Sequence, residues 1–244
     1  MLDTYVINLD RSKDRLTTFE RLNGHLKIDF QRFPAIDGRE VARGTLVDRG
    51  LITGDFCYGD GALGCALSHL ALWDIAIEKN RPLTICEDDA IFNHGFSSAA
   101  ESVIQSLPQD WHLILWGWNF DSILLFDILP GVSPCLSLVD EARMRMGIDA
   151  FQSLRLAPQP FKLFNTFGLV GYSVSPQGAQ VMKQRCLPLR NIDVYIPGLG
   201  RTVANTGLDI LLNTLYREIN AYVSFPPLII TKNTHHDSTI QQET

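Results

Sequence analysis

The first 120 residues alternate short apolar runs with stretches in which apolar residues recur every three or four positions. The apolar run at 4–9 is followed by Ser12 and then by apolar residues at helical spacing, which indicates a strand and a capped amphipathic helix. Further strands are predicted at 25–33, 83–86 and 112–116, and further helices near 63–77 and 97–106. This alternation is typical of an α/β domain with a mostly parallel sheet.

The periodicity fades between residues 121 and 164, where four prolines occur. We therefore expect an irregular insertion there, of the kind that often shapes the site of a second substrate. Regular signals return as a strand at 168–174, a helix from Ser175-Pro176 to about 185, a helix at 208–215, and strands at 221–225 and 228–231. The pattern predicts one domain over residues 1–231 and a polar tail over 232–244.

The chain has 244 residues, with 21 basic and 27 acidic side chains and a formal net charge of −6 at pH 7. This charge argues against a nucleic-acid binder or a polybasic membrane-surface protein. No run approaches the roughly 18 apolar residues of a membrane span, and the N-terminus lacks the regions of a signal peptide. We expect a cytoplasmic protein, and contact with the inner face of the membrane is left open. The five cysteines lack CxxC spacing and are expected to be reduced structural thiols.

Three carboxylates in a row, Glu87-Asp88-Asp89, directly follow the predicted strand at 83–86. Adjacent like charges raise one another's pKa, so the triplet requires a counter-charge. In an extended chain Glu87 and Asp89 point to one side, at the strand end where open α/β sheets bind ligands. Such a pair suits Mg²⁺ or Mn²⁺ holding a diphosphate, and a solvated loop of surface acids is the alternative.

A second motif, Gly59-Asp60-Gly61-Ala62-Leu63-Gly64, matches the G-x-G-x-x-G pattern of dinucleotide-binding folds. It opens a predicted helix, which makes an NAD(P)-dependent oxidoreductase the first alternative function. However, the preceding segment at 51–58 contains Gly54 and Asp55 where a buried apolar strand is needed. The structural context that gives this motif its meaning is therefore missing.

Five blocks follow one another over about the first 195 residues. They are 6–11 (VINLDR) with Arg15, 33–38 (FPAIDG), 64–69 (GCALSH) with Trp73, 87–90 (EDDA), and Gly171-Tyr172 with Ser175 and Gly178-Ala179. Together these blocks resemble glycosyltransferase family 25, which includes bacterial lipooligosaccharide galactosyltransferases and collagen galactosyltransferases. The chain departs from the family at Ala62, where an acidic residue near the donor site is usual.

The resemblance implies a GT-A-like, Rossmann-type catalytic domain and an inverting transfer of a hexose, commonly galactose, from a UDP-sugar donor. The acceptor would be a hydroxyl group of an oligosaccharide, a lipooligosaccharide or another glycolipid. Mn²⁺ or Mg²⁺ would be held by Glu87 and Asp89. Asn and Asp can hydrogen-bond a base or ribose, and Arg can bind phosphate oxygens through two N–H groups. The donor-binding residues that the resemblance implies are Asn8, Leu9, Asp10, Arg11, Arg15, Ala35, Asp37, Gly38, Ser68, His69 and Asp88.

Such a transfer also needs a carboxylate that takes the proton from the acceptor hydroxyl. The resemblance makes Asp193 the first choice for this base or for a further metal ligand, and Asp209 is the second. Asp209 begins a predicted helix, so interaction with the helix amino end is its alternative role. His235 and His236, in the polar tail, are candidate metal ligands or solvated residues. A sugar-nucleotide-binding protein without transferase activity is the second alternative function, because of Ala62.

Overall fold

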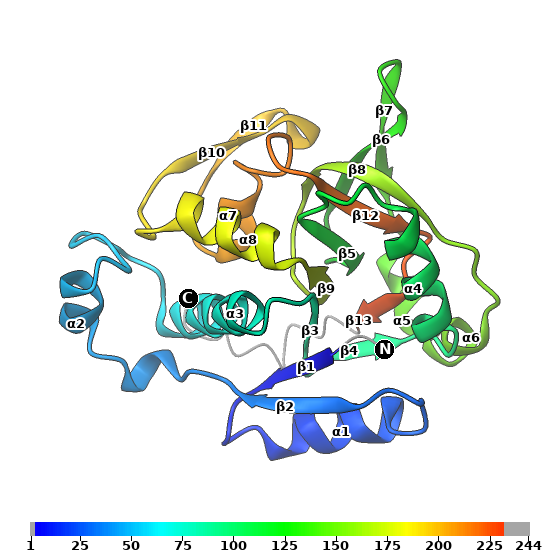
Figure 1. Ribbon diagram of the computed structural model, residues 1–244, viewed down its shortest axis with the longest axis horizontal. Helices are drawn as coiled ribbons and strands as arrows, with labels where there is room; N and C mark the ends of the chain where they lie inside the picture. The colour runs from blue at the N-terminus through cyan, green and yellow to red at the C-terminus, as the bar shows by residue number, and fades with distance from the viewer. Residues whose placement is uncertain (1–2, 232–244) are drawn as a thin grey trace.

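The computed structural model describes residues 3–231, and its centre is a nine-stranded sheet (Figure 1). The strands, in their order across the sheet, are β2 (Phe30–Pro34), β1 (Asp3–Asn8), β3 (Leu83–Glu87), β9 (Gly171–Val174), β5 (Leu113–Gly117), β12 (Ala221–Phe225), β8 (Gln159–Thr166), β6 (Ile123–Leu129) and β7 (Ser133–Leu138).

The sheet is mixed, which corrects the expectation of a mostly parallel one. Three neighbouring pairs, β1 with β2, β1 with β3 and β5 with β12, are parallel, and the other five are antiparallel. Two of the antiparallel pairs arise because β9 enters between β3 and β5 and runs opposite to both, and the other three join β12, β8, β6 and β7. The α/β class itself is confirmed, and the parallel part that matters most for the site is β2-β1-β3.

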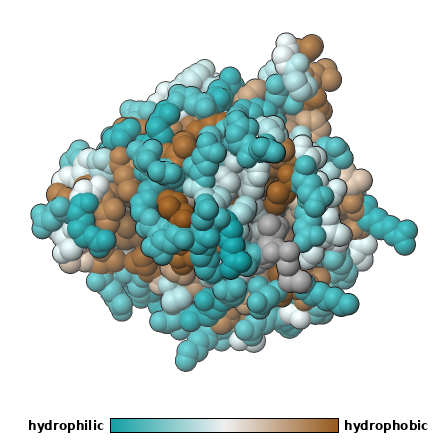
Figure 2. All heavy atoms as spheres, viewed as in Figure 1, coloured by the Kyte–Doolittle hydropathy of each residue, from teal (hydrophilic) through white to brown (hydrophobic). Residues whose placement is uncertain are grey.

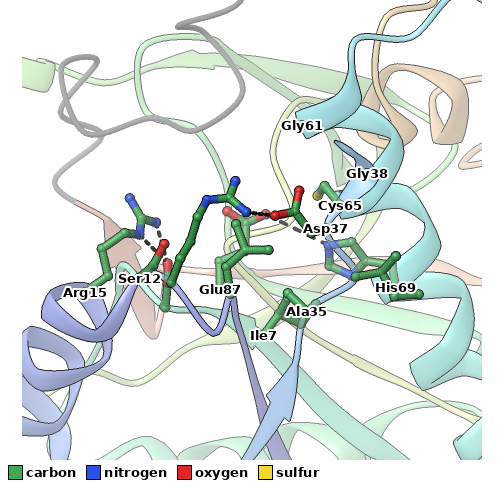
Figure 3. Close-up of a pocket in the computed structure, with 14 residues that line it drawn as sticks. Ile7, Ser12, Arg15, Ala35, Asp37, Gly38, Gly61, Cys65, His69 and Glu87 are labelled. Atoms are coloured by element: carbon green, nitrogen blue, oxygen red, sulfur yellow. Dashed lines mark hydrogen bonds and ion pairs between the residues drawn. The ribbon is translucent and has the colours of Figure 1, made fainter. Parts of the chain in front are cut away.

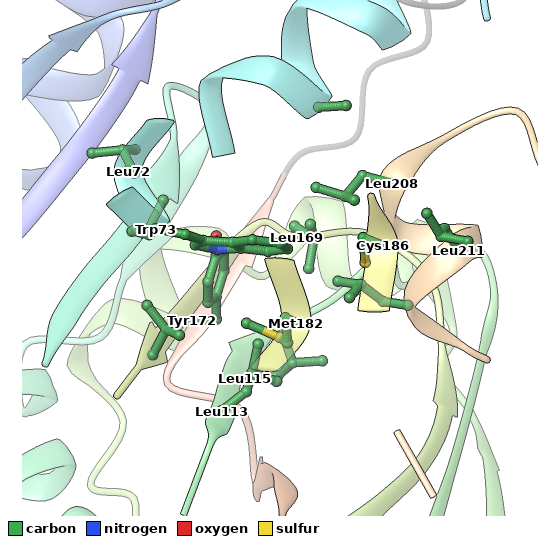
Figure 4. Packing of buried hydrophobic residues seen from close by; sticks show 14 of the residues in the cluster. Leu72, Trp73, Leu113, Leu115, Leu169, Tyr172, Met182, Cys186, Leu208 and Leu211 are labelled. Atoms are coloured by element: carbon green, nitrogen blue, oxygen red, sulfur yellow. The ribbon is translucent and has the colours of Figure 1, made fainter. Parts of the chain in front are cut away.

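Helices cover both faces of the central strands, and successive residues of these strands enter opposite cores. Tyr5 and Ile7 belong to one apolar cluster, whereas Val6 belongs to the other. The first cluster contains residues of α3 (Asp60–Lys79), α7 (Pro176–Cys186) and α8 (Leu208–Leu212), as Figure 4 shows in part. The second contains residues of α1 (Lys13–Asn23) and α4 (Phe96–Ser106). The result is three layers with the sheet in the middle.

Residues 121–164 are regular, and the expectation of an irregular insertion is wrong. They form β6, β7, α5 (Glu141–Met146), α6 (Ile148–Ser153) and most of β8, and they extend the central sheet. Pro134 is tolerated because β7 is the edge strand, with no neighbouring strand on its outer side among residues 3–231. The β6–β7 hairpin projects from the molecule, and Val132 at its tip is 81% exposed (Figure 2).

The remaining elements are short. They are α2 (Arg43–Asp48), the 3₁₀ helices at Gly38–Glu40 and Pro197–Leu199, and two strand pairs, β4 (Ala90–Phe92) with β13 (Ile229–Thr231) and β10 (Asp193–Ile196) with β11 (Arg201–Ala204). Within residues 3–231, no helix combines the length and apolar character that crossing a membrane requires. His235 and His236 lie outside the described residues.

Candidate active site

A pocket opens where the parallel strands β1, β2 and β3 end, against the first turns of α3 (Figure 3). It encloses about 600 Å³ including its open mouth. The predicted site residues that line it are Leu9, Arg11, Arg15, Ala35, Asp37, Gly38, His69, Glu87 and Asp88. The carboxyl ends of parallel strands meet at one edge of a sheet, so residues far apart in sequence converge here.

Asp88 is the buried member of the acidic triplet, and its charge is compensated. It accepts hydrogen bonds from Asn8 Nδ2 at 2.7 Å and from Arg15 Nε at 2.7 Å. Asn8 ends β1, Arg15 lies in α1 and Asp88 follows β3, so these bonds join three elements. Arg15 is thus the counter-charge that the triplet required.

Asp89 and Glu87 remain available to a cation. Asp89 Oδ1 is buried without a hydrogen-bond partner among residues 3–231, although the whole side chain is 33% exposed. Burial, followed by repulsion from Glu87, raises the pKa of Asp89 to about 7, and Arg15 opposes that rise from 3.7 Å. An unpartnered carboxylate oxygen beside a second carboxylate is chemically suited to a hard divalent cation. The residues present therefore fit Mg²⁺ or Mn²⁺.

His69 faces Glu87 from α3. Its side chain is fully buried, and Nδ1 lies 2.9 Å from the Tyr172 hydroxyl. Nε2 has no hydrogen-bond partner in the described chain and lies 3.9 Å from Glu87 Oε1. Cys65 lies one helical turn before His69, and burial, with the charge of Glu87, raises the pKa of its thiol well above the ordinary value.

The ligand atoms of Cys65, His69 and Glu87 all lie within 4.8 Å of one another. Figure 3 shows the sulfur and the imidazole on one side of α3, turned toward the end of β3. Sequence reasoning treated Cys65 as structural and missed this group. The sequence does contain an indication of this group: Cys65 and His69 are four residues apart in a predicted helix, and residues at that spacing share one helix face.

Arg11 and Asp37 line another part of the pocket. Arg11 forms an ion pair with Asp37 and keeps 39% of its side chain exposed. Arg39 also binds Asp37, with Nε 3.1 Å from Oδ1. The Arg39 hydrogen bonds first, and the charge of Arg11 to a lesser degree, lower the pKa of Asp37 to about 2. Arg11 therefore offers free N–H groups to an anion while Asp37 holds its position.

The loop that carries Asp37 is pressed against α3 by close backbone contact. A Cβ atom on Gly64 would collide with the Ile36 carbonyl oxygen and lie 2.7 Å from Gly38 N. Ser68 Oγ accepts the Ile36 N–H at 2.8 Å and donates to the Gly64 carbonyl at 2.7 Å. Ser68 is fully buried, so the structure gives it a supporting position behind the pocket wall.

A family model described as glycosyltransferase family 25 (LPS biosynthesis protein) matches residues 1–195, which include every residue that lines the pocket. The chain belongs to glycosyltransferase family 25. The family indicated by the five sequence blocks is therefore confirmed, and the pocket lies in the part of the chain that defines membership.

The relatives of known name are similar in sequence to about half of this chain. A glycosyltransferase 25 family member of Anopheles gambiae is 30% identical over 127 residues, which cover 46% of this chain and 21% of the relative. Procollagen galactosyltransferase 2 of Homo sapiens is 28% identical over 130 residues, covering 47% and 20%. The chain spans about a fifth of the length of these relatives. The crystal structure of A197 from STIV covers 91% of this chain at 8% identity, and its TM-score of 0.37 is too low to define the fold.

Asn8 and Asp10, two residues predicted to bind the donor, form hydrogen bonds or ion pairs with other residues of the protein. Asn8 is 2% exposed and donates through Nδ2 to Ser12 O and Asp88 Oδ2, while its Oδ1 accepts from Arg32 Nε at 3.1 Å. Asp10 is 82% exposed and pairs with Arg32. Asn8 thus organises the strand end, and Asp10 lies on its outer rim.

The two candidate bases of the family 25 chain differ in position. Asp193 begins β10 and is exposed. Asp209 lies in the first turn of α8, where it accepts the Gly168 N–H at 2.9 Å. Burial raises the pKa of Asp209, the hydrogen bonds lower it, and the charge of Glu87 adds to the rise. Of the acidic triplet, Glu87 acts on the pKa of Asp209, and its contribution is smaller than that of burial.

The glycine motif lacks the strand that dinucleotide binding requires. Residues 51–59 contain one isolated β-bridge, at Ile52, and otherwise turns and irregular chain before α3 begins at Asp60. Gly64 serves the close approach of α3 to the loop at Gly38 instead. Packing therefore accounts for Gly64, the last glycine of the motif.

Proposed function

We propose that this family 25 chain is an inverting glycosyltransferase that moves a hexose from a UDP-sugar to a hydroxyl of an oligosaccharide or lipooligosaccharide acceptor. The observation that carries the proposal is one pocket lined by Arg11, Arg15 and Glu87, with Asp89 beside it. Guanidinium groups suit a diphosphate, and paired carboxylates suit the divalent cation that accompanies one. The name procollagen galactosyltransferase among the relatives supports galactose as the sugar.

Each part of the pocket has a distinct role in this proposal. Arg11 and Arg15 bind the donor diphosphate, and Leu9, Ala35 and the Gly38 backbone contact the nucleoside. Glu87 and Asp89 would hold Mn²⁺ or Mg²⁺, which supplies charge neutralisation at the departing diphosphate.

A GT-A-like arrangement is also part of the proposal. The supporting feature is the parallel β2-β1-β3 unit with the pocket at its carboxyl end.

The acceptor hydroxyl would attack the anomeric carbon from the face opposite the departing diphosphate, and it needs a base that takes its proton. Asp209 and Asp193 are the candidates, and the electrostatic coupling of Asp209 to Glu87 supports the former. The exposed β10–β11 pair carries Asp193. If the acceptor binds against that pair, Asp193 takes the role instead. The two variants Asp209→Asn and Asp193→Asn separate these options, since the base variant loses turnover with little change in the KM for the donor.

The test of the function is thermal stability with UDP, UDP-galactose, UDP-glucose and NAD(P)H, each with and without Mn²⁺. A ligand at about 100 times its Kd stabilises the native state by about 2.7 kcal/mol, which raises the Tm of a chain this size by roughly 5–10 °C. We expect that shift with UDP and Mn²⁺ together, and loss of it in Asp89→Ala but not in Asp10→Ala. A shift with NAD(P)H alone would instead favour the oxidoreductase.

Release of UDP from the donor, measured with saccharide acceptors and with water, completes the test. Metal-dependent binding with no sugar transferred to any acceptor would favour the sugar-nucleotide-binding protein without activity. Galactose transfer that survives Asp89→Ala with its metal dependence unchanged would remove the acidic triplet from the reaction.

A further inference from the structure

We propose that Cys65, His69 and Glu87 form a binding site for Zn²⁺, which overlaps the proposed Glu87–Asp89 pair at Glu87. Zinc binding here follows from the geometry of three side chains and does not require the proposed transferase activity. It is read out by metal binding rather than by turnover.

The distances are close to those of a metal site. Zinc bonds to imidazole nitrogen, thiolate sulfur and carboxylate oxygen at about 2.0–2.3 Å, so the ligand atoms of a tetrahedral site lie about 3.5 Å apart. Here His69 Nε2 and Glu87 Oε1 are 3.9 Å apart, and all three ligand atoms lie within 4.8 Å. Glu87 is 30% exposed, so rotation of its side chain can close the remaining gap.

The histidine is held in the orientation that a ligand needs. Its Nδ1 lies 2.9 Å from the Tyr172 hydroxyl, which also accepts the Trp73 Nε1–H at 2.9 Å. When Nδ1–H donates to the phenol oxygen, Nε2 presents its lone pair toward Cys65 and Glu87. Nε2 is fully buried and has no partner within residues 3–231, and a cation would satisfy it.

The donor set determines which metal fits. Sulfur and imidazole ligands favour zinc, whereas Mg²⁺ and Mn²⁺ prefer oxygen ligands such as those of Asp89 and Glu87. All three side chains line the pocket, so the fourth coordination position of a bound zinc would open into it. Because Glu87 belongs to both sites, we expect Zn²⁺ and Mn²⁺ to compete.

Cobalt spectroscopy of the full chain tests the proposal directly. The reduced, chelator-treated protein is titrated with Co²⁺, which replaces zinc and gives an intense near-ultraviolet band only when a thiolate binds it. We expect this band in the wild type at one equivalent, and we expect Zn²⁺ to abolish it. Absence of the band in the folded wild-type protein would overturn the proposal.

Matched cysteine variants identify the thiolate. Cys65→Ser is expected to lose the band and to weaken Zn²⁺ binding at least about 100-fold, whereas Cys57→Ser, at an exposed cysteine outside the pocket, keeps both. A band that persists in Cys65→Ser, or disappears in Cys57→Ser, would refute the assignment. If Cys65→Ser does not fold, Glu87→Gln takes its place, with Zn²⁺ binding expected to weaken at least about tenfold. Unchanged Zn²⁺ affinity in Glu87→Gln would refute the site equally.

Discussion

The buried carboxylate of Asp88 is expected to be a major source of stability, and Asp88→Ala measures it. The substitution removes the acceptor of Asn8 Nδ2 and the main charge partner of Arg15, which are 2% and 28% exposed. Loss of one partner from a buried ion pair costs about 3–5 kcal/mol. Arg15 retains Asp89 at 3.7 Å and Asn8 retains Ser12 O, so we expect a loss of about 2–4 kcal/mol.

Urea unfolding and thermal unfolding measure this loss, and about 3 kcal/mol corresponds to a fall in Tm of roughly 6–12 °C. The matched control is Asp10→Ala, which also removes an aspartate from an arginine but at a side chain that is 82% exposed. Exposed ion pairs contribute about 0.2–1 kcal/mol, so the control should change the free energy of unfolding by less than about 1 kcal/mol. Equal losses in the two variants would refute the role assigned to burial.

Two further predictions concern the loop that carries Asp37. Gly64→Ala should lower the free energy of unfolding by about 1–3 kcal/mol because its Cβ would collide with the Ile36 carbonyl. Gly44→Ala, in a helix with open space around it, should raise that free energy by up to about 1 kcal/mol, and two similar Tm changes would contradict the packing argument. The pKa of Asp37 in the folded protein is about 2, below its ordinary value of 3.8, so its stabilisation is present above about pH 4 and is lost as the pH falls toward 2. Asp37→Asn should therefore be less stable than the wild type at pH 6, and the difference should be clearly smaller at pH 3, whereas a constant difference across that range would exclude the carboxylate as the cause.

The elements that the sequence predicts correctly are those with strong local patterns. Leu83–Cys86 is apolar apart from Thr84, and every one of these residues is fully buried in β3. The helix after it, α4, has clear amphipathic spacing. Because strand ends are located by these runs, the sequence also located the acidic triplet at the edge of the sheet. The helix expected to reach residue 215 ends at Leu212, and the strand expected at 25–33 is confined to Phe30–Pro34.

The features that the sequence did not predict depend on contacts between distant residues. A buried strand has the same apolar run whether its neighbours are parallel or antiparallel, so the direction of β9 could not be read. Prolines such as those in β7 and β8 favour irregular chain in a sequence pattern, although an edge strand and a strand start both tolerate them. Likewise, nothing local indicates that Asp88 meets Asn8 across 80 residues.

The antiparallel strand β9 also has a consequence for synthesis of the chain. β9 pairs with both β3 and β5, and about 84 residues separate the end of β3 from the beginning of β9. At roughly 5–20 residues per second, a ribosome takes on the order of 10 s to cover that distance. During this interval the backbone N–H and C=O groups of β3 on the side away from β1 lack their partner strand, and the centre of the sheet cannot close. A nascent chain of this length should therefore be a substrate for chaperones until residue 174 has emerged.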